Sequence, residues 1–304
     1  MNRPISTKKP ISLGSDPEMF VFQGAKLLPA YEFLQAKDAG QPIFWDGFQA
    51  EWRYDHEDKC SQDSLINLTR ERLAVLNLIA KDRKAKLSLT NVVRVPQVTL
   101  ETAHTEHVEL GCMPSYNAYQ LRGQPVENPR KLPYRFAGGH MHFGTWTRRP
   151  KYERIVCTLD DILGVWAVGA ARYFDNPVRR MYYGLAGEYR KPEYKEGFGV
   201  EYRVLSNFWL ASPNLMRLVW NLGTLCVRLA QRRNLLLWAG NTQETIDTIN
   251  NCDAERAEQI LTRNEPMLRW ILGQVYKQEE VDQAIKIGLQ GYPNEGNFLK
   301  EWGI

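Results

Sequence analysis

Apolar and polar residues alternate along several short stretches in the first two thirds of the chain, and this period of two predicts β-strands. Longer stretches with apolar residues at helical spacing predict helices. The expected strands cover residues 11–22, 43–54 with a tight turn at Asp46-Gly47, 92–100, 136–144 and 197–208. The expected helices cover 64–86 with Asp63 as N-cap, 152–173, a region that Pro213 opens, and shorter segments over 242–304. The pattern therefore indicates a mixed α and β fold.

The stretch from Phe136 to Gly144 contains the motif Gly-Gly-His-Met-His-Phe-Gly. If it is extended, His140 and His142 lie on one face of the strand and Met141 and Phe143 on the other. Glycines on both sides allow a ligand or a second backbone to approach. A His-x-His pair predicts either a metal site or two hydrogen-bonded core histidines. Acidic partners elsewhere in the chain would favour the metal site.

Acidic residues alternate with apolar ones on three further predicted strands. Carboxylates with imidazoles and no thiolate favour hard cations such as Mg²⁺ or Mn²⁺. Nearby arginines suit a metal-bound triphosphate, because guanidinium groups match the geometry of phosphate oxygens. For Asp16 and Glu18 a solvated strand end is the simpler alternative. The candidate residues are Asp16, Glu18, Glu51, His140, His142 and Glu201, with Arg180, Arg190 and Arg203 beside them.

Two other stretches, a His-x-x-His pair and a long connection, contain patterns that can be functional. His104 and His107 form a His-x-x-His pair that could bind zinc on a helix, but their Thr-rich, polar surroundings favour a solvated loop. The Pro- and Arg-rich connection over 122–135 is long enough to predict a functional loop or lid.

Composition excludes several classes of protein. The 304 residues are 43% hydrophobic and 24% charged, which is typical of a globular protein, and no internal repeat is visible. The net charge is +4, and Arg3, Lys8 and Lys9 lie in the first ten residues, so no nucleic-acid face is indicated. Five scattered cysteines predict a reducing compartment. We expect no signal peptide, no membrane span and a cytoplasmic protein, with a flexible basic tail over 1–10 and one domain over 11–304, helical from 213 onward.

The order of the motifs resembles that of the carboxylate–amine ligases of the glutamine synthetase and glutamate–cysteine ligase superfamily, particularly the phage COOH-NH2 ligase group. The similar segments are Gly14–Phe20, Asp46 with Glu51-x-Arg53, Gly138–Gly144, Arg180-x-x-Tyr183-Gly184-x-x-Gly187-x-Tyr189-Arg190 and Glu201-Tyr202-Arg203, together with Gly111-Cys112-x-Pro114-Ser115-x-Asn117-Ala118. They extend over residues 11–212.

The resemblance implies a glutamine-synthetase-like fold, in which a bent, mostly antiparallel sheet holds the acids on its concave face and helices pack outside. It implies ATP and Mg²⁺ or Mn²⁺ as cofactors, and a reaction that joins a small-molecule, peptide or protein carboxylate to an amine through an acyl phosphate. The implied metal ligands are Asp16, Glu18, Glu51, His140 and Glu201. Arg190, Arg203 and His142 would contact the nucleotide, with Arg190 and Arg203 acting in catalysis and Arg180 binding the substrate carboxylate.

Two other functions use the same residues. A metal-dependent hydrolase acting on an amide or phosphate would use a bound water as nucleophile and would not require ATP. A catalytically silent binding protein on the same fold would be expected to lack one of the metal residues, and none is missing. If the chain is phage-encoded, its compartment is the host cytoplasm. The sequence gives no indication of the oligomeric state.

Overall fold

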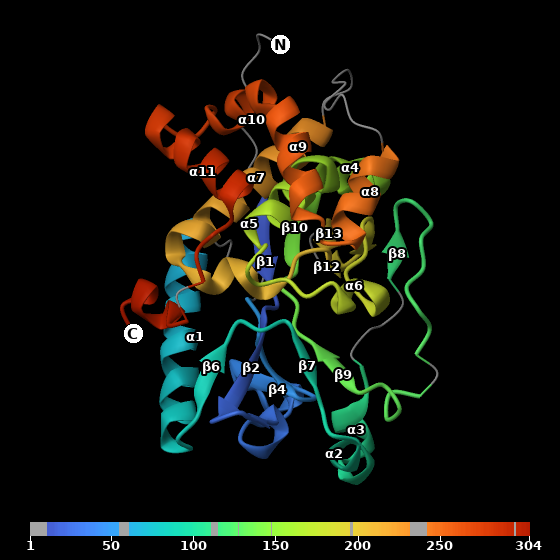
Figure 1. The fold of residues 1–304 in the computed structure, drawn as a ribbon, viewed down its shortest axis with the longest axis vertical. Coiled ribbons are helices and arrows are strands. Elements are labelled where there is room, and N and C mark those ends of the chain that lie inside the picture. The colour runs from blue at the N-terminus through green and yellow to red at the C-terminus, as the bar shows by residue number, and fades with distance from the viewer. Residues whose placement is uncertain are drawn as a thin grey trace.

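The computed structural model describes residues 11–54, 61–110, 115–126, 128–146, 148–194, 197–231, 242–294 and 296–304. The predicted tail over 1–10, Cys60 and Cys112 lie outside these ranges. Within them the fold is a mixed α+β arrangement in which every strand ladder is antiparallel, as the alternating pattern and the resemblance predicted (Figure 1). No helix of the described ranges combines the length and the apolar character that a bilayer crossing requires.

The first sheet contains the histidine strand between β1 (Ser12–Ser15) and β13 (Gly197–Tyr202). Its strands follow the order β1, β10 (Met141–Trp146), β13, β11 (Glu188–Arg190) and β8 (Tyr116–Asn117), and β12 (Glu193–Tyr194) also pairs with β13. The partners of β10 are far from it in the chain, so the sheet brings the end of β1, next to Asp16, and Glu201 of β13 beside the histidine strand.

The second sheet lies below the first in Figure 1 and continues the N-terminal strand. It has the order β3 (Lys26–Leu28), β2 (Glu18–Gln23), β5 (Gln49–Trp52) and β4 (Ile43–Asp46), and β6 (Lys86–Ser88) pairs with β2. A separate ladder joins β7 (Val92–Arg94) to β9 (Tyr134–Phe136). The predicted hairpin is confirmed, because Asp46 pairs with Gln49 across the turn.

The prediction of one strand over 11–22 was wrong. The chain leaves the first sheet after Ser15 and enters the second at Glu18, and the break falls at Asp16-Pro17. Proline has no backbone N–H to offer a ladder, which favours a break at this point. The strand predicted over 197–208 likewise ends at Tyr202, and that over 92–100 is limited to Val92–Arg94.

The three long predicted helices are present, with corrected ends. Helix α1 (Gln62–Asp82) is capped by the side chain of Ser61 instead of Asp63, and it ends before 86 because β6 begins there. Helices α4 (Tyr152–Leu159) and α5 (Val165–Ala170) form one rod interrupted by a π-helical turn, Asp160–Gly164. Helix α7 (Pro213–Ala230) begins at the predicted proline.

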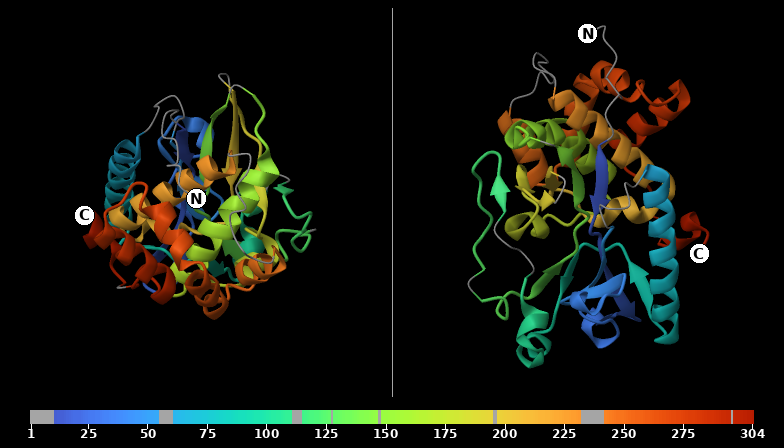
Figure 2. Two further views of the ribbon diagram at one scale, coloured as in Figure 1. Left: turned by 90° about the horizontal axis from the view of Figure 1, so that it is seen from above. Right: turned by 180° about the vertical axis from the view of Figure 1, so that it is seen from behind.

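Shorter helices complete the chain. They are α2 (Gln97–Thr102), α3 (Thr105–Val108), α6 (Val178–Tyr182), α8 (Thr242–Asn250), α9 (Ala254–Arg263), α10 (Glu265–Leu272) and α11 (Gln278–Gln290), with 3₁₀ turns Ala30–Glu32, Lys37–Ala39, Asn207–Ala211 and Phe298–Trp302. Short helices therefore occupy most of the region predicted as a solvated loop around His104 and His107. Figure 2 shows the same division from behind, with the C-terminal helices around the first sheet and α1 alongside the second.

The core lies on the helix side of the first sheet. Met141 and Phe143 are fully buried there, with Val200 and Tyr202 beside them. Apolar positions of α4, α5 and α7 pack in the same cluster of side chains. Because neighbouring residues of a strand point to opposite faces, burial of this set leaves His140, His142 and Glu201 on the other side of the sheet.

Candidate functional site

The candidate site lies on that other side of the first sheet, where β1 ends and β2 begins. The register pairs Gly14 with His142, His142 with Glu201, and Glu201 with Arg190. Directly paired residues of antiparallel strands share a face, so these four form one row across β1, β10, β13 and β11. Three of the four predicted acidic or histidine strands therefore meet through backbone pairing alone.

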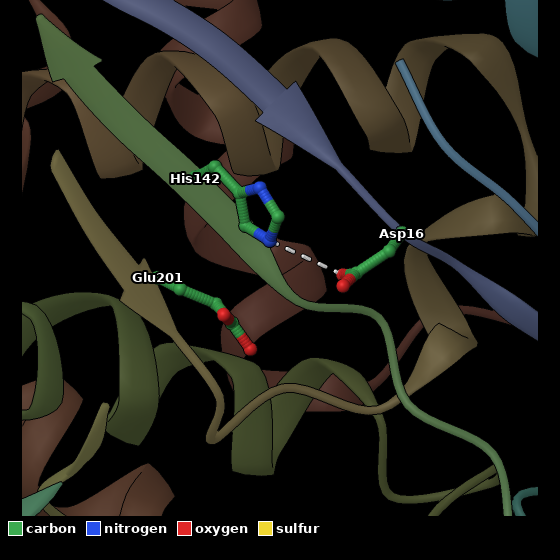
Figure 3. A group of neighbouring side chains, drawn as sticks. All are labelled: Asp16, His142 and Glu201. Carbon is green, nitrogen blue, oxygen red and sulfur yellow. Dashed lines mark ion pairs between the residues drawn. The ribbon is translucent and has the colours of Figure 1, made fainter. Parts of the chain in front are cut away.

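The first cluster consists of Asp16, His142 and Glu201, whose ligand atoms lie within 4.8 Å of one another (Figure 3). His142 Nε2 is 3.3 Å from Asp16 Oδ1. His140 joins this cluster, since its Nδ1 is 3.1 Å from Asp16 Oδ1 and 3.6 Å from Glu201 Oε1. Asp16 comes from the break between the two sheets, His142 and Glu201 lie within β10 and β13, and His140 directly precedes β10.

Charge compensation dominates this first cluster. Burial by itself would raise the pKa of Asp16, but the facing charges of His142 and His140 hold that pKa well below its ordinary value. Burial opposes the charged form of both imidazoles; the pKa of His140 is lowered, whereas the Asp16 carboxylate keeps the pKa of His142 above its ordinary value. The cluster therefore favours an ionised Asp16.

The second cluster contains three carboxylates, Glu18, Asp46 and Glu51, again with oxygens within 4.8 Å of one another. Glu18 and Glu51 are direct ladder partners on β2 and β5, a placement that like charges normally disfavour. Asp46 reaches them from the end of β4. The backbone N–H of Gly138 donates to Glu18 Oε2 at 2.7 Å, which ties this cluster to the histidine strand.

The pKa values of the three carboxyl groups in the second cluster are raised, whereas that of Asp16 in the first cluster is lowered. Burial, followed by the charge of Asp46, raises the pKa of Glu18 to about 8. Burial and the charge of Asp16 hold the pKa of Glu51 well above its ordinary value, and burial also raises the pKa of Asp46 although Lys37 opposes it. Three carboxylates whose charge Lys37 compensates only in part are a donor set that fits a hard divalent cation.

Two of the predicted arginines contact the first cluster. Arg203 Nε lies 3.1 Å from Glu201 Oε1, and Arg190 Nη1 lies 3.5 Å from the same oxygen. Arg203 is nearly fully buried and also donates to the hydroxyl of Ser115, whereas the side chain of Arg190 is 26% exposed. Arg190 therefore retains access to a ligand from solvent.

The structure does not bring Arg180 into either cluster. Its guanidinium is buried, donates to the carbonyls of Gly184 and Val204, and lies 3.5 Å from Asp175 Oδ2. The prediction that Arg180 binds a substrate carboxylate therefore gains no support from its position. The adjacent Arg179 also donates to main-chain carbonyls, those of Val204 and Leu205.

His140 differs from His142 in the way its ring is held. Its Nδ1 faces Asp16 and its Nε2 contacts the hydroxyl of Tyr183, so both ring nitrogens have partners within the protein. The glycines before it serve close packing, as predicted: a Cβ on Gly138 would meet that hydroxyl, and one on Gly139 would meet the backbone of Ser206. His142 is the more accessible imidazole, with 22% of its side chain exposed.

A pocket of about 420 Å³ opens beside both clusters. Its lining includes Asp16 and His142 from the first cluster and Glu51 from the second. Lys37, Arg53 and Tyr54 add polar and cationic groups to the wall, and Lys37 Nζ is 3.4 Å from Glu51 Oε1. One cavity can therefore hold a ligand that contacts both acidic clusters.

Comparison with known protein families agrees with the motif order. The sequence model described as Phage phiEco32-like COOH.NH2 ligase-type 2 matches residues 130–294, more than half of the chain. The chain belongs to this family. No curated protein matches the sequence. Membership makes the protein an enzyme of the ligase class whose substrates are a carboxylate and an amine.

The matched part of this COOH-NH2 ligase contains the histidine strand, Arg190, Glu201 and Arg203, but not the N-terminal acids. Asp16, Glu18 and Glu51 are connected to it by the geometry described above. Sequence reasoning missed Asp46 as a member of the second cluster. The register of a two-residue hairpin turn would have indicated it, since Asp46 opposes Gln49 on the face that carries Glu51.

Tyr183 and Lys37 were also missed as neighbours of the site. Tyr183 lies in the quoted motif, but its contact with His140 depends on a turn whose course the sequence pattern does not determine. His104 and His107, in contrast, do not join either cluster; the ring of His107 stacks on Tyr31 with centroids 4.0 Å apart.

Proposed function

We propose that the protein is an ATP-dependent carboxylate–amine ligase that forms an amide or peptide-type bond through an acyl phosphate. The observation that supports this proposal is a single pocket lined by members of both acidic clusters, in a chain of a COOH-NH2 ligase family, with Arg190 in contact with Glu201 of the first cluster. Neighbouring carboxylates at this density suit a ligand that is itself strongly charged, such as a metal-bound triphosphate.

Divalent cations fit the residues that are present. Glu18, Asp46 and Glu51 would hold one Mg²⁺ or Mn²⁺, and Asp16, His142 and Glu201 are the candidates for another. His140 belongs to the implied ligand set, but with both ring nitrogens engaged we assign it to orienting Asp16. When bound, the cations would neutralise the phosphate charge and bring it toward the substrate carboxylate.

The proposed reaction has two steps, phosphoryl transfer to the carboxylate and attack of the amine on the acyl phosphate. A carboxylate oxygen attacks the γ-phosphorus of ATP, the bond to the β–γ bridging oxygen breaks, and ADP leaves. The amine nitrogen then attacks the acyl carbon, inorganic phosphate leaves with the electron pair of the C–O bond, and the nitrogen loses a proton. Arg190 and Arg203 would contact phosphate oxygens as the charge moves during transfer, with His142 beside the nucleotide.

We further propose that residues 11–304 act as a single ligase domain with a glutamine-synthetase-like arrangement of acids on one side of the strands and helices on the other. One hydrophobic cluster that runs from Leu13 to Trp302 supports the single domain. The described cysteines, Cys157, Cys226 and Cys252, are free thiols, which fits the reducing cytoplasm that we propose as its location.

Titration calorimetry with Mg²⁺-ATP tests the proposal directly. We expect saturable, Mg²⁺-dependent nucleotide binding that Glu51→Gln abolishes. In a second assay, we expect ADP release in the presence of the correct substrates from a panel of amino acids, peptides and polyamines. Absence of any Mg²⁺-dependent nucleotide binding would remove the ligase proposal. Turnover of an amide or phosphate substrate with metal alone would instead indicate a hydrolase.

A further inference from the structure

A buried carboxylate on the helix side of the first sheet connects the two strands that carry Arg190 and Glu201. Asp160, the first residue of the π-helical turn, is fully buried. The hydroxyl of Tyr202 donates to its Oδ1 at 2.6 Å, and the backbone N–H of Gly187 donates to its Oδ2 at 2.6 Å. One carboxylate therefore attaches to β13 and to the start of β11 at once.

These two attachment points lie close to site residues in the chain: Tyr202 is next to Glu201, and Gly187 is three residues before Arg190. Tyr202 follows Glu201 in β13, and Gly187 precedes β11, which ends at Arg190. Tyr202 pairs with Tyr189 on the helix side, while Glu201 pairs with Arg190 on the pocket side. The β11–β13 ladder has these two pairs, and the N–H of Arg203 also donates to the carbonyl of Glu188 at 3.1 Å. Because the ladder is this short, a further attachment on the helix side restricts the spacing of the pair on the pocket side.

Two glycines leave the space that the contacts of Asp160 with Tyr202 and Gly187 require. Gly187 has φ +81°, a left-handed conformation, and a Cβ there would lie 2.8 Å from Asn117 Oδ1. Gly164, at the end of the π-helical turn, would place a Cβ 2.9 Å from the Tyr202 hydroxyl. π-Helical turns in α-helices often mark functional sites. Two glycines and one irregular turn thus permit a single buried carboxylate to reach both strands.

We propose that Asp160 is a positioning residue, which holds β11 against β13 so that Arg190 and Glu201 keep their relative placement for the nucleotide. The inference rests on the proposed function, because nucleotide binding by that site is its main readout. Asp160 does not touch the pocket itself; it acts through the hydroxyl of Tyr202 and the N–H of Gly187.

Three variants and a matched control test the proposal with Mn²⁺-ATP as the probe in titration calorimetry. Asp160→Ala removes both attachments, Tyr202→Phe removes one, and Asp160→Asn can still accept from Gly187 N–H and donate to the Tyr202 oxygen. The control is Asp161→Ala in the same turn, because Asp161 accepts from the hydroxyl of Thr245, at 2.9 Å, on α8 and not from β11 or β13.

We expect Asp160→Ala to weaken Mn²⁺-ATP binding about tenfold or more, which is the loss expected when one charge-assisted contact to the ligand is misplaced. Tyr202→Phe should have a smaller effect, Asp160→Asn should restore binding, and Asp161→Ala should bind as the wild type does. If Asp160→Ala fails to fold, the Mn²⁺-ATP affinities of Tyr202→Phe and Asp160→Asn are compared with that of the wild type.

Wild-type affinity in both Asp160→Ala and Tyr202→Phe would overturn the proposal. An equal loss in Asp161→Ala would also overturn it, because a general loss of stability would then explain the effect. If the wild-type protein binds no Mn²⁺-ATP, the proposed function fails, and a crystal structure of Tyr202→Phe then decides the inference separately. An unchanged Arg190–Glu201 separation of 3.5 Å in that variant would refute it.

Discussion

Replacing Glu18 with glutamine should make the metal-free protein more stable while removing metal binding. The change keeps the shape of the side chain, and the amide oxygen can still accept from Gly138 N–H. It removes one of three neighbouring carboxyl groups that lie within 4.8 Å of one another. A residue whose charge serves a ligand is expected to destabilise the protein when that ligand is absent.

The magnitude follows from the pKa of Glu18. The ordinary value is 4.5, and burial together with Asp46 raises it to about 8 in the folded protein. The folded state thus retains a proton that the unfolded state releases, so wild-type stability falls as the pH rises from 4.5 toward 8. At about 1.4 kcal/mol per pH unit, the loss at pH 7 has an upper limit of about 3 kcal/mol.

Urea and thermal unfolding in the presence of a chelator measure this effect. We expect Glu18→Gln to be more stable than wild type by about 1–3 kcal/mol at pH 7, or roughly 2–6 °C in Tm, with the difference vanishing near pH 4.5. Titration with Mn²⁺ should stabilise only the wild type. Equal stability of the two proteins at pH 7, or a difference that does not depend on pH, would refute the reasoning.

Glu201→Gln provides the contrasting control, because the same chemical change meets a different environment. Glu201 Oε1 faces Arg203 at 3.1 Å, Arg190 at 3.5 Å and His140 at 3.6 Å. Removing its charge leaves the buried guanidinium of Arg203 without its carboxylate, so stability should fall by about 3 kcal/mol. Turnover should be lost in both variants, and retained activity in either would count against its assigned role.

Three further predictions concern Arg190, Arg180 and the cation. Arg190→Lys should lower kcat by on the order of 10²-fold or more with far less change in ATP affinity, because lysine lacks the planar set of donors of the guanidinium group. Wild-type turnover in this variant and in Arg190→Ala would indicate that Arg190 is a solvated side chain without a catalytic role. Arg180→Met should reduce the free energy of unfolding by about 3 kcal/mol, since Asp175 keeps its bonds to Asn91 and Ser206 but loses the cation beside it, and an unchanged urea midpoint would contradict this. Mn²⁺ at about 100 times its Kd should stabilise the wild type by about 2.7 kcal/mol in thermal unfolding, and an equal gain in Glu51→Gln would argue against the second cluster as its site.

The strand faces could be predicted because the period of two leaves little choice once one face is apolar. His140 and His142 lie opposite the buried Met141 and Phe143, and Glu201 lies opposite the buried Val200 and Tyr202, as the alternation indicated. The helix that Pro213 opens was equally clear, since its apolar stripe is continuous.

Other features depend on pairing between distant segments, which alternation does not encode. The pattern of 11–22 continues through Asp16-Pro17, yet the chain changes sheets there. Asp46 and Glu51 share a hairpin, but their approach to Glu18 depends on the pairing of β5 with β2. Arg180 has the composition of a ligand-binding residue, but its partners are Asp175 and two carbonyl groups whose proximity the sequence does not reveal.

The order of strands in the first sheet also has a consequence for synthesis of the chain. β1 ends at Ser15, but its ladder partner β10 begins at Met141 and β13 begins at Gly197. At ribosomal rates of about 5–20 residues per second, the first acids wait on the order of ten seconds or more for the strands that complete their surroundings. During this interval the charged, proline-interrupted segment around Asp16, Pro17 and Glu18 is a poor template for pairing with other nascent chains. We therefore expect Asp16 and Glu18, which are proposed to bind metal in the folded protein, to disfavour such pairing while the chain grows.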